Sequence, residues 1–241
     1  MFLQQKNFGI IGLSVGHSIA LTIATERICK EIRLADFDTL ELSNLNRIRT
    51  GIHNLGLPKV VIAAREIAEI DPYINVKIYD EGVNQNNIED FFEGEGKLDI
   101  VVEVCDSLEV KILTRLHARQ KQIAVVMDTN DRGMLDVERF DIEIDRPIFH
   151  GLIKEDELID IESKNANERL PILMKIVSFE NCSDRLKYSL TQIGKTITSF
   201  PQLASAVVLG GAITTDIVRR ILLKQHQSSG RFYIDLEKLI F

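Results

Sequence analysis

The sequence predicts an α/β protein with a doubly wound, Rossmann-like and mainly parallel sheet, followed by a helical C-terminal extension. Two observations lead to this fold class. Between residues 7 and 128, short runs with the two-residue period of strands alternate with stretches of helical periodicity. Polar residues also follow the ends of the predicted strands, where open α/β sheets bind their ligands.

Five strands are expected in this half of the chain, over residues 8–12, 32–37, 76–79, 99–104 and 123–127. Four helices are expected between them, over residues 17–30, 59–70, 87–92 and 108–120. The second helix ends against Asp71-Pro72 because proline cannot continue a helix. Right-handed crossover connections would stack these units into one sheet.

After Asp128 the pattern changes to turns and short irregular strands, followed by helical stretches at residues 155–161, 168–179 and 185–193. A last long helix is expected over residues 201–223. Gly210-Gly211 inside it indicates either close helix packing or a break. We expect the tail RFYIDLEKL to add an edge strand.

Composition limits the class of protein. The 241 residues, 45% hydrophobic and 27% charged, suffice for a sizeable core. A net charge of −7 argues against nucleic-acid binding, which needs a basic face. No apolar run approaches the roughly 20 residues that span a bilayer, so we expect no membrane segment. The start MFLQQKNF lacks the layout of a secretion signal and predicts a cytoplasmic protein.

The three cysteines predict neither disulfides nor structural zinc. Cys29, Cys105 and Cys182 are odd in number, widely spaced and without a CxxC pair. Cys105 is expected to pack at a strand end as a small apolar residue. Cys182 lies outside the predicted sheet, and a thioester role for its thiol is left open beside a purely structural one.

The run LADFDTLELSNLNR predicts a nucleotide site. Asp36 ends an apolar strand, and a carboxylate at that edge suits the hydroxyls of a ribose. Asn44, Asn46 and Arg47 follow in one loop, with amide donors and a guanidinium fork that match phosphate oxygens. Lys59 opens the next helix and adds a second cation.

The first strand-to-helix turn, GIIGLSVGHS, departs from the dinucleotide-binding fingerprint. The fingerprint requires G-x-G-x-x-G. If Gly12 is its first glycine, Ser14 occupies the position of its second glycine. An NAD-dependent oxidoreductase, with Asp36 as its ribose acid, is therefore one alternative. The loop that carries Asn44, Asn46 and Arg47 argues against it, because an NAD domain has no need for such a loop.

Four segments occur in order between residues 8 and 128: DFDTLELSNLNR, GLPK before a helix, EIDPYINV and DIVVEVCD. With them the chain resembles the ThiF/MoeB/HesA superfamily, adenylylating enzymes related to the activating enzymes of ubiquitin-like proteins. The segments LSVGHSIA, MDTNDRGMLDVERFD and RPIFHG are more narrowly similar to a bacterial subgroup, some of whose members carry an additional nitroreductase-like domain.

The resemblance implies ATP and Mg²⁺ as cofactors and assigns roles to residues of this chain. The nucleotide would be bound by Gly12, Ser14, Gly16, Asp36, Asp38, Asn44, Arg47 and Lys59. The catalytic residues would be Arg47, Lys59 and Asp106. Of these, Arg47 and Lys59 would neutralise phosphates, and Asp106 at the end of the fourth strand would hold the magnesium ion.

The function implied is ATP-dependent adenylyl transfer. A carboxylate, either a small acid or the C-terminus of a ubiquitin-like or sulfur-carrier protein, would become an acyl adenylate with release of pyrophosphate. Residues 1–130 would form the adenylylation core, and residues 131–241, in the same domain, the substrate and dimer face of a homodimer. The altered glycine turn, together with the missing arginine that many relatives carry before the first strand, supports a second alternative, a non-catalytic nucleotide-binding scaffold.

Several further residues have two interpretations. The group Asp128, Asn130, Asp131 and Arg132 would either dock a substrate terminus or form a plain turn. His17 would either donate to a phosphate or satisfy local carbonyls, and His150 is expected to fix a turn. The stripe formed by Ile213, Ile217 and Ile221 is expected to be core or dimer face. Arg49 is expected to be a solvated charge.

Overall fold

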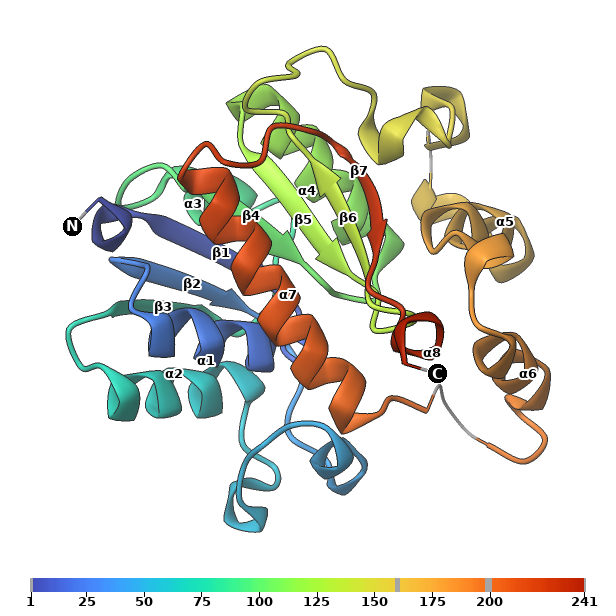
Figure 1. Ribbon diagram of the computed structural model, residues 1–241, viewed down its shortest axis with the longest axis horizontal. Coiled ribbons are helices and arrows are strands. Elements are labelled where there is room, and N and C mark those ends of the chain that lie inside the picture. Colours follow the sequence, from blue (N-terminus) through green and yellow to red (C-terminus); the bar gives the residue numbers. More distant parts are fainter. Residues whose placement is uncertain (1, 159–160, 198–200, 241) are drawn as a thin grey trace.

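One seven-stranded sheet forms the centre of the computed structural model, which describes residues 2–158, 161–197 and 201–240 (Figure 1). The strand order is β3-β2-β1-β4-β5-β6-β7. The five parallel strands are β1 (Asn7–Ile11), β2 (Glu31–Ala35), β3 (Asn75–Tyr79), β4 (Ile100–Glu103) and β5 (Ala124–Asp128). Two antiparallel strands complete one edge, β6 (Met134–Glu138) and β7 (Gly230–Tyr233).

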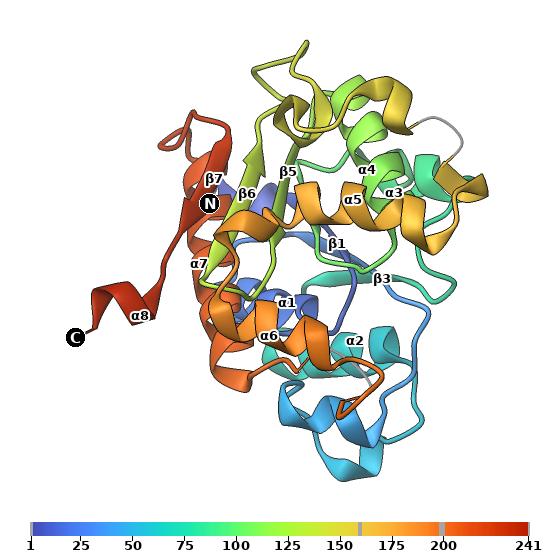
Figure 2. The same cartoon turned by 90° about the vertical axis from the view of Figure 1, so that its right-hand side faces the viewer.

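Helices cover both faces of the sheet (Figures 1 and 2). One face carries α1 (Gly16–Glu26), α2 (Lys59–Ile70) and α7 (Ala204–Leu222), and the other carries α3 (Ile88–Glu93), α4 (Leu108–Lys121) and α5 (Ala166–Ile176). The remaining α-helices are α6 (Asp184–Gln192) and α8 (Leu236–Leu239). The 3₁₀ turns are η1 (Leu3–Gln5), η2 (Leu42–Asn46), η3 (Ile52–Asn54), η4 (Ile148–Gly151), η5 (Glu155–Leu158), η6 (Ile161–Ser163) and η7 (Phe179–Asn181).

The predicted α/β class and mainly parallel sheet are confirmed, and the tail adds the predicted edge strand, β7. Some boundaries were wrong. The first helix stops at Glu26 because Arg27 takes a left-handed conformation, with φ of 54°, and caps it. The expected helix 155–161 consists of two 3₁₀ turns in its described part, and residues 159–160 lie outside the described residues. The last helix begins at Ala204 instead of residue 201.

Two apolar cores, one on each face, fix the sheet. On the α1 side, strand residues such as Ile10 and Leu34 pack with α1, α2 and α7. On the α4 side, Phe91 and Phe149 belong to the second core. In the isoleucine stripe of α7, Ile217 and Ile221 are buried in the first core and Ile213 packs against it, so the stripe is core and not a dimer face.

The glycine pair in α7 allows close packing without a break. The helix is continuous from Ala204 to Leu222. A Cβ atom added at Gly211 would lie 2.5 Å from Ser18 Oγ of α1, and one at Gly210 would lie 2.0 Å from Asp128 Oδ2. Only glycine therefore permits α7 to lie this close to α1 and to the end of β5.

A buried ionic network ties α4 to the sheet. The guanidinium of Arg115, which is fully buried, donates to Glu103 Oε2 at 2.7 Å and to Glu138 Oε2 at 2.5 Å. Burial alone would raise the pKa of Glu103, but Lys111 and Arg115 hold that pKa below its usual value. Glu103 Oε1 also accepts from the amide of Cys105 at 2.9 Å. The network thus fixes the backbone between the end of β4 and Asp106.

Within the described ranges, none of the helices combines the length and the apolar character needed to cross a bilayer.

Candidate nucleotide site

The candidate site lies at the carboxyl edge of the sheet, where β1 and β4 are neighbours. Chain connections leave in opposite directions from these two strands, and such a switch point is where open α/β sheets bind ligands. Gly12 follows β1, Asp36 follows β2, and Asp106 follows β4 after two residues. The loop that carries η2 and η3 projects from the same edge (Figure 1, light blue).

The glycine turn and Asp36 hold one another. Gly12 has a φ of 91°, and a Cβ atom there would lie 2.8 Å from the amide nitrogen of Cys105. The amide of Leu13 donates to Asp36 Oδ2 at 2.6 Å, and the amide of Asp38 donates to Oδ1 at 2.8 Å. Burial raises the pKa of Asp36, and Lys59 opposes this rise. Asp36 is therefore a buried anchor of the turn whose oxygens still have further acceptor positions.

Lys59 is held in the site by Asp38. The ammonium nitrogen lies 2.7 Å from Asp38 Oδ2, and the side chains are 7% and 52% exposed, respectively. Lys59 opens α2, and its backbone amide donates to the carbonyl of Asp38 at 3.0 Å. The cation is thus fixed at the site by both its backbone and its side chain, with a partner that borders solvent.

Arg47 reaches back to the glycine turn. Its Nε donates to Ser14 Oγ at 2.8 Å, and its Nη1 donates to Asn46 Oδ1 at 3.0 Å. Burial lowers the pKa of Arg47, and the nearby negative charge of Asp106 opposes this shift. Asp106 itself is exposed. Arg47 and Asp106 are therefore close enough for their charges to influence one another.

The segment before α7 closes over this turn. Ser14 Oγ donates to Gln202 Oε1 at 3.3 Å, and Asn46 Nδ2 donates to the backbone carbonyl of Gln202 at 2.9 Å. No local pattern in the sequence predicts a role for Gln202, which lies 188 residues beyond Ser14.

Two predicted phosphate contacts have local partners. Asn44 is buried, and its Oδ1 accepts from the amide of Glu41 at 3.0 Å, which stabilises η2. His17 is buried, and its Nε2 lies 2.7 Å from Glu66 Oε2 on α2. The partner of His17 is thus a carboxylate of α2, neither a local carbonyl nor a phosphate, and a phosphate role for Asn44 stays a prediction.

The residues after β5 do not gather at the candidate site. Asp131 accepts from the amide and the hydroxyl of Ser183 at 2.8 and 2.6 Å, and Arg132 Nε lies 2.7 Å from Asp235 Oδ2. Asp128 accepts from the amide of Asn130 at 3.0 Å, as in an Asx turn. These contacts favour the plain-turn interpretation over a docking site.

Neither Cys105 nor Cys182 is built as a nucleophile. Burial raises the pKa of both thiols, that of Cys182 to about 11 and that of Cys105 still further. Because the thiolate is the reactive form, both are largely unreactive at neutral pH. His150 does fix a turn, since it has a φ of 57° and its Nε2 lies 2.9 Å from Asp136 Oδ1.

The donor set fits a magnesium ion held mainly by phosphates. In the described part of the chain, no group of three or more His, Cys, Asp or Glu side chains forms a metal centre. Magnesium in nucleotide sites typically takes one or two carboxylates and keeps phosphate oxygens and waters as its other ligands. The exposed carboxylate of Asp106, whose charge is felt by Arg47, meets that requirement.

The sheet and this site define a Rossmann-like protein of the nucleotide-binding class. More narrowly, the chain belongs to the ThiF family, whose family model matches residues 3–234.

Comparison with individual proteins agrees with this assignment. Uncharacterized protein MT1398 of Mycobacterium tuberculosis (strain CDC 1551 / Oshkosh) is 41% identical over 234 residues, which make up 97% of this chain and 32% of MT1398. The chain thus spans about a third of that relative. The E. coli tRNA N6-threonylcarbamoyladenosine dehydratase TcdA in complex with AMP has a TM-score of 0.64 at 17% identity, over 93% of this chain and 88% of TcdA. E. coli MccB with ATP has a TM-score of 0.61 at 14% identity, over 97% and 64%. These two structures share the fold.

Proposed function

We propose that this protein is an ATP-dependent adenylyltransferase that activates a carboxylate as an acyl adenylate and releases pyrophosphate. The single observation that carries the proposal is the convergence of Arg47, Lys59 and Asp36 around the glycine turn at one edge of the sheet. Membership of the ThiF family supports it. Structures of the same fold that contain AMP or ATP support the choice of nucleotide.

The roles follow from the chemistry of adenylyl transfer. Asp36 accepts from the ribose hydroxyls, while Arg47 and Lys59 face phosphate oxygens. An oxygen of the substrate carboxylate bonds to the α-phosphorus, the bond from that phosphorus to the α–β bridging oxygen breaks, and pyrophosphate leaves with the electron pair. Two cations already fixed by Ser14 and Asp38 stabilise the developing charge with little reorganisation.

In this proposal Asp106 holds Mg²⁺, which neutralises charge on the phosphate oxygens when bound. Gly12, Ser14 and Gly16 provide the turn along which the phosphates lie. Ser14 Oγ meets both Arg47 and Gln202, so a bound nucleotide exchanges these contacts for its own.

The acid that is activated is a small carboxylic acid or the C-terminus of a ubiquitin-like or sulfur-carrier protein. We further propose that residues 131–241, in the same domain as the core at residues 1–130, supply the substrate face and the dimer face of a homodimer. The outer side of α7 supports a dimer face there, because Ala204, Val208 and Ala212 line an open hollow of about 450 Å³. A monomer in sedimentation equilibrium would refute the dimer.

One observation favours a non-catalytic scaffold as the second candidate. The hydroxyl of Ser14 lies in the middle of the glycine turn and is bonded to Arg47 and Gln202. These two contacts stand in the way of a phosphate that would approach the backbone of the turn. ATP–pyrophosphate exchange separates the two functions, because exchange needs reversible formation of the acyl adenylate and a scaffold gives none.

The test combines binding and turnover in the full chain. Calorimetry should detect ATP binding in the presence of Mg²⁺, and exchange should appear with one class of carboxylate. Arg47→Ala together with Asp106→Ala should abolish exchange and weaken ATP binding at least tenfold, since each removes a charged contact. Arg220→Ala together with Asp145→Asn, at exposed positions on the C-terminal half of α7 and on the loop after β6, is the matched control. No ATP binding, or binding that Arg47→Ala and Asp106→Ala leave unchanged, would refute the proposal.

A further inference from the structure

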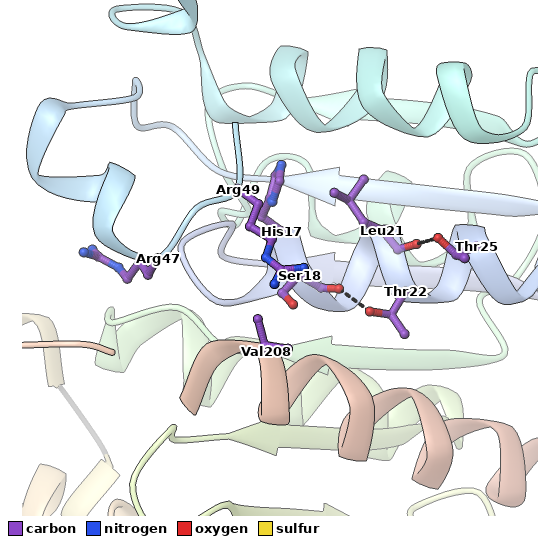
Figure 3. Close-up of a pocket in the computed structure, with 8 residues that line it drawn as sticks. All are labelled: His17, Ser18, Leu21, Thr22, Thr25, Arg47, Arg49 and Val208. Carbon is purple, nitrogen blue, oxygen red and sulfur yellow. Dashed lines mark hydrogen bonds between the residues drawn. The ribbon is translucent and has the colours of Figure 1, made fainter. Parts of the chain in front are cut away.

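A cavity of about 220 Å³ lies beside the glycine turn (Figure 3). Its walls come from three separate segments of the chain. The first turn of α1 contributes His17, the loop after η2 contributes Arg47 and Arg49, and α7 contributes Val208 from the opposite side. The start of α1 and the loop of residues 47–50 thus face one cavity, and the contacts that hold them at this spacing also set the position of Arg47.

One carboxylate of α2, that of Glu66, bonds to both of these segments. Its Oε2 lies 2.7 Å from His17 Nε2, and the side chains of Glu66 and His17 are 21% and 3% exposed, respectively. Glu66 also accepts a hydrogen bond from Thr50, at the end of the loop. Asn54 of η3 in turn donates to Thr50 Oγ1 at 2.7 Å. Glu66 therefore joins α1, α2 and the loop of residues 47–50.

Glu66 is the acceptor in both contacts. Burial alone would raise the pKa of Glu66, but the hydrogen bonds from His17 and Thr50 hold that pKa below its usual value. A carboxylate that is ionised at neutral pH only accepts hydrogen bonds, so the proton in the 2.7 Å contact lies on His17 Nε2. Hydrogen bonds to an ionised group are roughly twice as strong as those between neutral groups. Both contacts therefore belong to the strong kind.

The loop of residues 47–50 is tied to the start of α1 at both of its ends. At one end, Arg47 Nε donates to Ser14 Oγ at 2.8 Å. At the other end, Thr50 bonds to Glu66, which also holds His17. In the proposed function, a bound nucleotide replaces the contact between Arg47 and Ser14. The tie through Glu66 does not involve Ser14, so it remains when the nucleotide is bound.

We propose that His17, Glu66 and Thr50, here named the Glu66 brace, are positioning residues that hold Arg47 in place for the nucleotide. The inference rests on the proposed function, which assigns Arg47 to phosphate oxygens. A loop that is already ordered loses little conformational freedom when a ligand binds, whereas a loose loop must be ordered at that moment, which lowers the affinity. The brace acts on ATP through Arg47 and makes no contact of its own with the nucleotide.

Thr50→Val tests the brace, because it removes one hydroxyl and keeps nearly the same size of side chain. In calorimetry of the full chain with ATP and Mg²⁺, this variant should bind ATP about tenfold more weakly than the unaltered protein. Thr50→Ser restores the hydroxyl and should recover most of the affinity. Glu69→Gln, at an exposed position of the same helix as Glu66, is the matched control and should leave the affinity unchanged.

A second pair of variants acts on the other end of the brace. His17→Leu removes the donor to Glu66 and should also weaken ATP binding about tenfold. His17→Gln keeps an N–H donor at the end of a side chain of similar length, so it should bind ATP better than His17→Leu. Recovery by both conservative variants would show that the hydrogen bonds, and not the packing of the side chains, are responsible.

Coupling to Arg47 separates a positioning role from a merely structural one. In an Arg47→Ala background, Thr50→Val should change the ATP affinity less than twofold, because the side chain that the brace positions is absent. Equal tenfold losses in both backgrounds, or an ATP affinity that Thr50→Val and His17→Leu leave unchanged, would overturn the inference even if ATP–pyrophosphate exchange is present. Coupled losses of ATP affinity in a protein without exchange activity would keep the brace and reject adenylyl transfer.

Discussion

Asp128 should make the stability of this protein fall as pH rises through the weakly acidic range. Its carboxyl group is buried, Oδ1 accepts from the amide of Asn130, and Oδ2 has no hydrogen-bond partner among the described residues. The backbone of Gly210 in α7 packs against that unpartnered oxygen. Burial raises the pKa of Asp128 from 3.8 to about 7, and backbone hydrogen bonds only partly oppose the rise.

The sign of the effect follows from proton linkage. Between pH 3.8 and about 7 the folded protein keeps the proton of Asp128 and the unfolded chain releases it, so rising pH favours unfolding. A tenfold difference in proton affinity is worth about 1.4 kcal/mol, so the two pKa values correspond to a loss of roughly 4 kcal/mol at most. The loss begins above pH 3.8 and is complete above pH 7.

Asp128→Asn removes this titration while keeping the size of the side chain. The amide oxygen still accepts from the backbone amide of Asn130. The unpartnered Oδ1 of Asn130 lies near the same point of α7 as Asp128 Oδ2, 3.1 and 2.0 Å from the position of a Cβ at Gly210, and is the acceptor available to the new NH₂ group. We expect the variant to gain stability over the unaltered protein as pH rises, by about 2–4 kcal/mol at pH 8. Below about pH 4 the two proteins should differ little.

Urea unfolding followed by circular dichroism, at intervals between pH 4.5 and pH 8, measures this difference directly. The exposed Asp145→Asn is the control, because it removes one negative charge without a buried group. The other titrating groups are common to all three proteins and cancel in the comparison. If the free energies of unfolding of Asp128→Asn and the unaltered protein stay parallel over this range, the reasoning is wrong.

Three further predictions concern the turn, the buried network and the thiols. Gly12→Ala should lower the free energy of unfolding, measured in urea, by about 2 kcal/mol or more, because the new Cβ atom lies 2.8 Å from backbone at a position with a positive φ. Gly56→Ala, where φ is also positive but no atom lies within 4 Å of the new Cβ, should lower it by about 1 kcal/mol. Equal losses of stability would contradict the close approach of the turn to the end of β4. Arg115→Met should cost about 3–5 kcal/mol in the same assay, because the buried Glu138 loses its cation and Glu103 keeps only Lys111. A stability within about 1 kcal/mol of the unaltered protein would speak against the network. Cys182→Ser should keep full ATP–pyrophosphate exchange. In the folded unaltered protein, the Cys182 thiol should react slowly with a disulfide reagent at pH 8, because burial raises its pKa to about 11. Loss of exchange in Cys182→Ser would restore a thioester role.

The fold was predictable because its signals are local. The helix at residues 59–70 has the predicted bounds, since a proline limits it on each side. The parallel strands followed from alternating apolar runs that the two cores then bury. Strand ends were less predictable. The expected strand 32–37 stops at Ala35 because the carboxylate of Asp36 captures the amides of Leu13 and Asp38, a contact between distant segments.

The sequence predicted the part of the candidate site that lies in one loop, but not the contacts that α7 adds to it. Asp36, Arg47 and Lys59 all lie in the connection that leaves the carboxyl end of β2, and parallel strands have their carboxyl ends at one edge of the sheet. Their position at that edge could therefore be predicted. The burial of Asp128 and the position of Arg49 in a cavity depend on α7, which follows them by about 80 and 160 residues along the chain. No period or motif in the sequence encodes such contacts.

Helix α7 therefore connects parts of the site that the sequence keeps far apart. Its first residues follow Gln202, which bonds to the glycine turn and to Asn46, while Gly211 lies on α1 and Gly210 on the carboxyl group of Asp128. The contacts differ in strength. The two hydrogen bonds of Gln202 are worth about 1 kcal/mol each, so an incoming nucleotide can replace them. The glycine contacts are backbone packing that cannot move without a shift of the whole helix. Exchange of the Gln202 contacts for those of a ligand therefore requires no movement of α7.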